Sequence, residues 1–179
     1  MKTESKYREG LLDLLKTTKL EDINVSMLCE KVGSNRQTFY YHFRDISDVV
    51  ESIFLRFKIY KESIKDIDLC HKKLIELINK NYDFFFKISE SYANEKLNNF
   101  LYTYYYQKLK EIISENKKNE NYAPLLSRYC STLFAKELNF WILTKRRERT
   151  HSLMKRFEII WKYFTSQYVS ESKKGFLIR

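Results

Sequence analysis

The stretch that decides the fold is KVGSNRQTFYYHFRD, residues 31–45. It holds one glycine, a run of short polar side chains, four aromatic residues around His42, and no carboxylate before Asp45. No other histidine or cysteine stands at metal-ligand spacing from His42, since His71 and His151 are remote in sequence. The stretch is therefore better explained as part of a core, or as a surface that recognises a partner, than as a metal or catalytic site.

The composition of the whole chain predicts a helical protein. Its 179 residues include three glycines and one proline, which leaves little material for β-hairpins or glycine-lined nucleotide loops. Hydrophobic residues make up 44% of the chain, enough to build a core. We therefore expect an all-α fold.

The cysteines and the hydropathy pattern bear on the compartment. Cys29, Cys70 and Cys130 are odd in number and far apart, which favours a reducing compartment over a disulfide framework. The first residues lack the apolar stretch of a signal peptide, and no run approaches the ~18 apolar residues of a membrane span. We expect a soluble, cytoplasmic protein with no membrane partner.

Apolar residues at helical spacing predict two helices before the opening stretch. The first is expected over residues 5–17, with Ser5 as its N-cap. The second is expected over residues 25–32. Asn24 is placed to cap its start, and Gly33 to end it in the left-handed conformation that glycine tolerates.

A third helix should begin after Ser34 and run through Phe43, and a fourth should open at Ser47. Two short helices joined by a turn containing glycine are typical of a helix-turn-helix, whose second helix lies in the major groove of DNA. Side chains that can contact bases crowd the first turn of this helix, although plain helix capping would also explain them. They are Asn35, Arg36, Gln37 and Thr38.

The net charge of +10 is unevenly distributed. Residues 1–58 carry ten Lys or Arg against nine Asp or Glu, and residues 59–179 carry twenty-three against fourteen. Within the balanced first segment, residues 31–44 hold three cations and no carboxylate. A short segment with positive charge and no carboxylate is what contact with DNA phosphates needs. An ordinary solvent-exposed surface could carry the same three cations.

The order and spacing of residues 32–45 resemble the helix-turn-helix of the TetR/AcrR family of transcriptional regulators, and the likeness extends from about Leu11 to Phe57. The resemblance implies an N-terminal three-helix DNA-binding domain over 1–58, and a C-terminal helical regulatory and dimerisation domain over 59–179. It further implies a homodimer that binds a palindromic operator in double-stranded DNA, as a repressor, with release by a small-molecule effector in most relatives.

The same resemblance assigns roles within the third helix. Phe39 and Phe43, four residues apart, are expected in the core. The family pattern implies base contacts for three side chains and phosphate contacts for three others. The former are Arg36, Gln37 and Tyr41, and the latter are Thr38, Tyr40 and His42.

Two positions complete the predicted DNA-binding set. Asn24 stands where the family commonly has a threonine that contacts phosphate. Ile46 stands where the family commonly has a lysine, so either the neighbouring Arg44 replaces that phosphate contact or the contact is missing. The predicted DNA-binding residues are Asn24, Asn35, Arg36, Gln37, Thr38, Tyr40, Tyr41, His42 and Arg44.

The rest of the chain is expected to be helical over 69–88, 97–115, 124–145 and 151–169, with a polar loop over 114–124. The last two helices resemble the helix pair through which the family dimerises, although apolar stripes also fill intramolecular cores. The predicted interface residues are Leu133, Phe140, Trp141, Phe157, Ile160, Trp161 and Phe164.

Two kinds of effector remain open. Six aromatic side chains could line a pocket for a small apolar or aromatic ligand, or could simply fill a core. The phrase FRDISDVV, 43–50, resembles a branch typified by the activator of dihydroxyacetone kinase genes, which implies a protein partner instead. The basic turn KRRERT, 145–150, could meet an acidic partner or be solvated. The candidate pocket residues are Tyr82, Phe85, Phe86, Tyr102, Tyr105 and Tyr106.

Other classes of protein fit the sequence less well. An enzyme would need a nucleophile with a base, paired carboxylates or a phosphate loop, and we find none at a defensible spacing. We expect no catalytic residue, cofactor or metal. The serious rival is a DNA-binding adaptor, co-activator or architectural protein that binds DNA with little sequence choice and is regulated by a protein partner.

Overall fold

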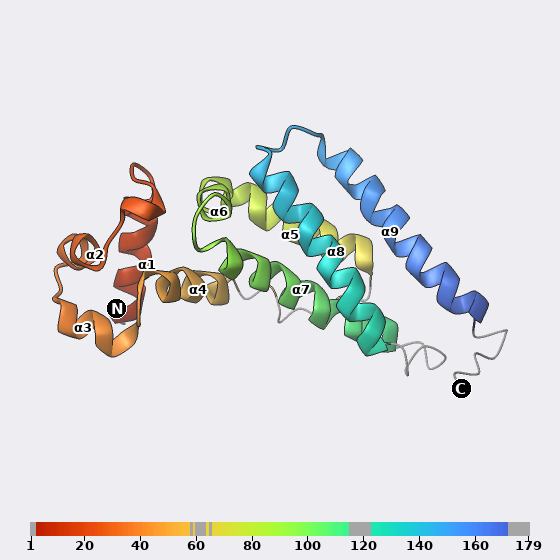
Figure 1. The fold of residues 1–179 in the computed structure, drawn as a ribbon, viewed down its shortest axis with the longest axis horizontal. Helices are drawn as coiled ribbons and strands as arrows, with labels where there is room; N and C mark the ends of the chain where they lie inside the picture. The colour runs from red at the N-terminus through yellow and green to blue at the C-terminus, as the bar shows by residue number, and fades with distance from the viewer. Residues whose placement is uncertain (1–2, 58, 60–63, 65, 115–122, 172–179) are drawn as a thin grey trace. The chain divides into compact units, whose positions relative to one another are not determined.

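The computed structural model describes residues 3–57, 59, 64, 66–114 and 123–171, with side chains described to residue 166 (Figure 1). All regular elements within these ranges are helical, which confirms the predicted all-α fold with an N-terminal helix-turn-helix. The predicted loop over 114–124 falls almost entirely outside the described residues.

The chain divides into two compact units, which are described separately. Unit 1 comprises Met1–Lys58 and Ile78–Phe100, and unit 2 comprises Ile59–Leu77 and Leu101–Arg179. The unit boundary falls within α5, after Leu77, and within α7, after Phe100, so each of these helices contributes residues to both units. The functional division into 1–58 and 59–179 stays a prediction. The elements are α1 Thr3–Leu14, η1 Leu20–Asp22, α2 Val25–Val32, α3 Arg36–His42, α4 Ile46–Arg56, α5 Ile67–Lys80, α6 Tyr82–Ser89, α7 Asn94–Ser114, α8 Ala123–Leu143 and α9 Thr150–Glu171.

The local signals around α2 behave as predicted. The Asn24 side chain accepts a hydrogen bond from Met27 N at 3.1 Å, and so caps the start of α2. Gly33 ends α2 with φ 65°, in the left-handed region that disfavours other residues. A Cβ at Gly33 would meet no atom within 4 Å, so the preference for glycine at this position comes from the left-handed backbone conformation and not from crowding.

Several predicted boundaries are wrong, and the first helix, expected to reach residue 17, ends at Leu14. Ser5 lies inside α1 rather than at its N-cap, and its hydroxyl donates to Glu9 Oε1 at 3.3 Å. The fourth helix begins at Ile46 rather than Ser47, because the Asp45 side chain accepts from Asp48 N and caps the helix so that it starts one residue earlier. The single helix predicted over 69–88 is two helices, broken at Asn81, whose ψ of 32° is not helical.

The core of unit 1 holds the helix-turn-helix against α1. The Tyr7 ring meets the rings of Phe39 and Phe43 edge-on, with centroids 5.4 and 5.8 Å apart. Gly10 allows α1 to approach α2 closely, since a Cβ there would lie 2.4 Å from Val32 Cγ1. The buried rings contribute roughly 1.5–3 kcal/mol each.

Residues 78–100 are joined to the N-terminal helices by a cluster of phenylalanine rings. Phe54 of α4 stacks on Phe100 with centroids 4.8 Å apart, and Phe57 stacks on Phe85 at 5.7 Å. Phe84 also contacts Phe54, at 5.3 Å. This cluster explains why α6 and the start of α7 belong to unit 1 rather than unit 2.

Candidate nucleic-acid interface

The turn between α2 and α3 is fixed from inside unit 1. Ser34 N donates to Cys29 O at 2.9 Å, which continues the backbone bonds made at Gly33. The Tyr7 hydroxyl and Ser34 Oγ lie 2.7 Å apart and share a hydrogen bond. Because Tyr7 is fully buried, this bond ties the turn to the core and sets where α3 begins.

The first turn of α3 is capped by its own side chains. Asn35 Oδ1 accepts from Thr38 N at 2.8 Å and from the Thr38 hydroxyl at 3.1 Å. Asn24 and Asn35 therefore each use the amide oxygen for a cap. Their Nδ2 groups can still donate, which is the role a phosphate contact requires.

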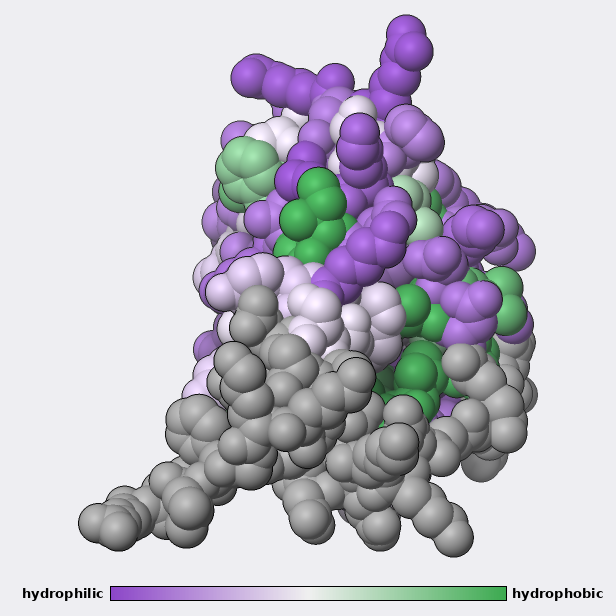
Figure 2. Space-filling view, turned by 90° about the vertical axis from the view of Figure 1, so that its right-hand side faces the viewer, coloured by the Kyte–Doolittle hydropathy of each residue, from purple (hydrophilic) through white to green (hydrophobic). Residues whose placement is uncertain are grey.

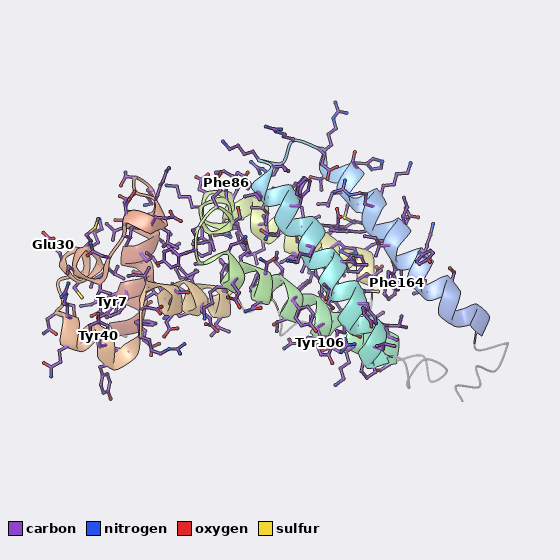
Figure 3. All side chains as sticks on the ribbon, in the orientation of Figure 1. Tyr7, Glu30, Tyr40, Phe86, Tyr106 and Phe164 are labelled. Carbon is purple, nitrogen blue, oxygen red and sulfur yellow. The ribbon has the colours of Figure 1, made fainter. Side chains whose placement is uncertain are left out.

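The outer face of α3 is exposed and aromatic. Tyr41 is 85% exposed and Tyr40 57% exposed, whereas Phe39 on the same helix is fully buried. Figure 3 labels Tyr40 on α3. Gln37 is also exposed, and His42, half-buried, packs edge-on against Tyr41 with centroids 5.0 Å apart. The helix thus presents phenol and amide groups outward while its phenylalanine anchors it.

The three cations of residues 31–44 have different partners. Lys31 Nζ lies 2.7 Å from Asp13 Oδ2, and hydrogen bonds from Lys16 and Lys31 together lower the pKa of Asp13 to about 2. Arg44 forms an ion pair with Asp48 at 2.8 Å. Arg36 instead hydrogen-bonds Ser26 Oγ, a neutral group. Two of the three cations in residues 31–44 are therefore paired with carboxylates, and Arg36 is not.

Ile46, at the position where the TetR/AcrR pattern commonly has a lysine, is a core residue. It is 4% exposed and is the first residue of α4. The nearest cation in sequence, Arg44, also uses its guanidinium to bind Asp48. A phosphate contact by Arg44 would thus rely on the N–H groups that Asp48 leaves unused.

Ser26 was not among the predicted site residues. It is the second residue of α2, it is exposed, and it accepts two hydrogen bonds from Arg36 across the turn. Periodicity does not reveal this pairing, because it depends on how α2 and α3 cross. The polar character of Ser26 at an otherwise apolar helix start is the signal that could have flagged it.

The candidate pocket residues are divided between the units. Tyr82, Phe85 and Phe86 lie in unit 1, where Phe85 is fully buried in the phenylalanine cluster. Tyr105, in unit 2, is fully buried and its hydroxyl lies 3.0 Å from His71 Nδ1. The other four are half-buried, and they stack in pairs: Tyr82 on Phe86, and Tyr102 on Tyr106.

The predicted interface residues fall into buried and exposed groups. Trp141 and Phe157 are buried within unit 2 itself, where the Trp141 indole donates to Glu148 O at 3.1 Å. Phe140 is 60% exposed, and Leu133 is exposed as well. Ile160, Trp161 and Phe164 are half-buried on α9. Exposed apolar side chains that were not predicted extend both helices' outer faces: Leu125, Tyr129, Leu143, Ile159 and Tyr163.

On the face drawn in Figure 2, the described residues are mostly hydrophilic, with hydrophobic residues among them. Within the described residues, no three His, Cys, Asp or Glu side chains gather as a metal ion would require. None of the helices in the described part of the chain is both long and apolar enough to cross a membrane.

Comparison with known proteins identifies a solved structure with a similar fold. No family model and no curated protein sequence matches the chain. Among solved structures, it is similar to the dihydroxyacetone kinase operon activator DhaS, with a TM-score of 0.64 at 19% sequence identity. The match covers 93% of this chain and 96% of that chain. At this identity the comparison establishes that the two chains share a fold along nearly their whole length.

Proposed function

We propose that this protein is a sequence-specific DNA-binding regulator of transcription, in which α3 enters the major groove. The observation that carries the proposal is the division of α3 between its two faces. Phe39 is buried against α1, while Gln37, Tyr40 and Tyr41 are exposed on a helix whose start is fixed by the core. The fold shared with DhaS, a protein named as an operon activator, agrees with this role.

The contacts follow from the chemistry of the exposed groups. Gln37 can pair with adenine, Arg36 with guanine, and Tyr41 can reach base edges from the next turn. Tyr40 and His42 donate to phosphates and fix the register of the helix on the duplex. The Thr38 hydroxyl donates to Asn35 Oδ1 in the free protein, so its phosphate contact requires that the hydroxyl turn from Asn35 to the DNA. Asn24 and Asn35 complete the set of backbone contacts, whereas Arg44 is bound by Asp48 in the free protein.

A homodimer that binds a palindromic operator belongs to the same proposal. A single module contacts too few groups for a tight and selective site, whereas two modules about 34–36 Å apart read successive major grooves. The exposed apolar residues of α8 and α9, including Phe140, Leu133 and Tyr163, provide a surface that self-association would bury. The mass of the protein in solution tests this part, and a monomer at micromolar concentration would contradict it.

The direction of regulation and its trigger are also proposals. The TetR/AcrR resemblance supports repression, whereas the structural neighbour is named an operon activator. A reporter gene placed behind the selected site decides between them by the sign of the change in expression. For a small apolar or aromatic effector, the candidate contact is either the half-buried pair Tyr82 and Phe86 in unit 1 or the half-buried pair Tyr102 and Tyr106 in unit 2. A ligand-dependent loss of DNA affinity is the expected result.

The test of the function is selection of bound duplexes from a random pool with the purified protein. The proposal predicts enrichment of one palindrome, with half-sites one helical turn apart. Recovery of unrelated sequences at equal frequency would contradict it, and would indicate instead a DNA-binding adaptor that depends on a protein partner.

A further inference from the structure

Arg36 differs from the other two cations of residues 31–44. Lys31 and Arg44 each face a carboxylate within 2.8 Å. Among the residues that the structure describes, no carboxylate lies within ion-pair distance of Arg36, which is exposed. Its full positive charge therefore remains available to an approaching anion, on the helix that the proposed function places in the groove.

The partner of Arg36 is neutral and comes from the preceding helix. Ser26 Oγ accepts from Arg36 Nε at 3.0 Å and from Arg36 Nη2 at 2.6 Å. Ser26 is the second residue of α2 and Arg36 is the first residue of α3. A serine can hold the guanidinium in one place without cancelling its charge, which an aspartate at the same position would do.

The two bonds leave the guanidinium able to recognise a base. A guanidinium carries five N–H groups, and Ser26 takes the one on Nε and one on Nη2. Three remain, including the pair on Nη1 and Nη2 that forms a fork. This fork matches the O6 and N7 acceptors of guanine, and it matches two oxygens of a phosphate.

Both ends of the Ser26–Arg36 contact are held by the fold. Asn24 caps the turn of α2 that carries Ser26, and Asn35 caps the turn of α3 that carries Arg36. The Tyr7–Ser34 hydrogen bond fixes the turn between the two helices to the core. The backbone positions of the two residues are thus set before DNA arrives, and the remaining freedom is that of the long Arg36 side chain.

We propose that Ser26 is a positioning residue, which aims the Nη1/Nη2 fork of Arg36 at one base pair of each half-site and so sets the base preferred there. The inference rests on the proposed function, and it adds a specificity-determining residue on α2. Ser26 acts through Arg36, because it holds the side chain whose fork contacts the base.

The experiment compares the full-length wild type with Ser26→Ala, Ser26→Thr and Thr17→Ala. Each protein is titrated against the duplex selected by the wild type and against all single-base variants of one half-site. Ser26→Ala should lower discrimination roughly three- to tenfold at a single base pair, the loss expected for removing such hydrogen bonds. Ser26→Thr keeps the hydroxyl and should restore discrimination. Thr17→Ala removes a hydroxyl beyond the end of α1 and should match the wild type.

A second comparison uses an Arg36→Ala background. If Ser26 acts through Arg36, adding Ser26→Ala to Arg36→Ala should change nothing further at that base pair. A further loss shared by all duplexes would make Ser26 a direct phosphate contact and overturn the positioning role. Unchanged thermal unfolding of Ser26→Ala shows that the helix-turn-helix remains folded.

The result also separates this inference from the proposed function. A wild type that selects a palindrome, with Ser26→Ala showing the same base preference at every position, overturns the inference alone. A wild type that selects no sequence overturns the proposed function, and the role of Ser26 falls with it.

Discussion

Arg44 and Asp48 form a two-point ion pair across the start of α4. Arg44 Nε donates to Asp48 Oδ2, and Arg44 Nη2 donates to Asp48 Oδ1, both at 2.8 Å. Asp48 Oδ2 also accepts from Arg44 N at 3.0 Å. These hydrogen bonds lower the pKa of Asp48 and raise that of Arg44. The cation nearest to Ile46 in sequence is therefore bound by an acidic residue of α4 and is not free to contact DNA.

Replacing Asp48 with asparagine should release Arg44 toward phosphate. We expect higher affinity for all duplexes alike at low salt, and a salt dependence steeper by about one unit of slope, because one more cation displaces a counterion. Titration at several salt concentrations measures this slope. Asp13→Asn makes the same charge change beside Lys16 and Lys31 and is the matched control. An equal effect of both variants would mean that only net charge matters.

The close approach of α1 to α2 predicts that Gly10→Ala destabilises the protein, against the usual preference of helices for alanine. The new Cβ would lie 2.4 Å from Val32 Cγ1 and 3.2 Å from Leu28 Cδ1. Overpacking costs about 1–3 kcal/mol, whereas alanine gains roughly 1 kcal/mol over glycine in a helix interior. Urea unfolding should show a net loss of about 1 kcal/mol.

The compensating variant makes the same test sharper. Val32→Ala removes the atom nearest to the new Cβ, so the double variant Gly10→Ala/Val32→Ala should be less destabilised than the sum of the two single variants. Strict additivity would contradict the close approach.

Local signals in the sequence were enough to predict the helix-turn-helix. Asn24 and Gly33 act on the backbone within their own turn, so the bounds of α2 follow from them. The start of α4 was missed because Asp45 and Ser47 are both good caps, and only the fold selects Asp45.

Relations between helices were not predictable in this way. Phe140 and Trp141 are neighbours with similar hydropathy, yet Phe140 is exposed and Trp141 is buried, since adjacent helical residues point about 100° apart. The Ser26–Arg36 contact depends on how two helices cross. The break at Asn81 separates two helices, although the apolar residues on both sides follow the spacing of a single continuous helix.

A buried histidine predicts how stability depends on pH. His71 is buried, its ring stacks on Phe157 with centroids 4.3 Å apart, and burial lowers its pKa from 6.5 to about 3. Between these values the unfolded chain binds a proton that the folded chain does not, so stability falls as pH falls below about 6.5. From pH 7 to pH 5 the loss from this group is about 2 kcal/mol.

His71→Phe should remove this part of the pH dependence, measured as the difference in unfolding free energy between pH 7 and pH 5. The difference is informative even though the variant leaves the Tyr105 hydroxyl without its His71 partner, because that cost is the same at both pH values. His151→Phe, at an exposed position, should behave as the wild type. A pH dependence unchanged in His71→Phe would show that His71 is not the group responsible.

The Lys87 side chain connects α6 to the end of α1 by a hydrogen bond. Its ammonium donates to the backbone oxygen of Leu15, one of the carbonyls that a helix end leaves unpaired. Lys87→Met keeps the apolar stem and removes the donor, so we expect a loss of about 0.5–1.5 kcal/mol in urea unfolding. Lys80→Met, at an exposed residue of α5, is the control, and an equal loss in both would argue against the cap.

The proposed reading of a DNA sequence by α3 is tested most directly by the ratio of two affinities at physiological salt. The wild-type protein is titrated against its selected palindrome and against a duplex of the same composition in scrambled order. We predict that the protein binds the palindrome at least ~10³-fold more tightly than the scrambled duplex. Gln37→Ala should lower this ratio, because the variant loses discrimination at one base pair. Equal affinity for the two duplexes would contradict the account.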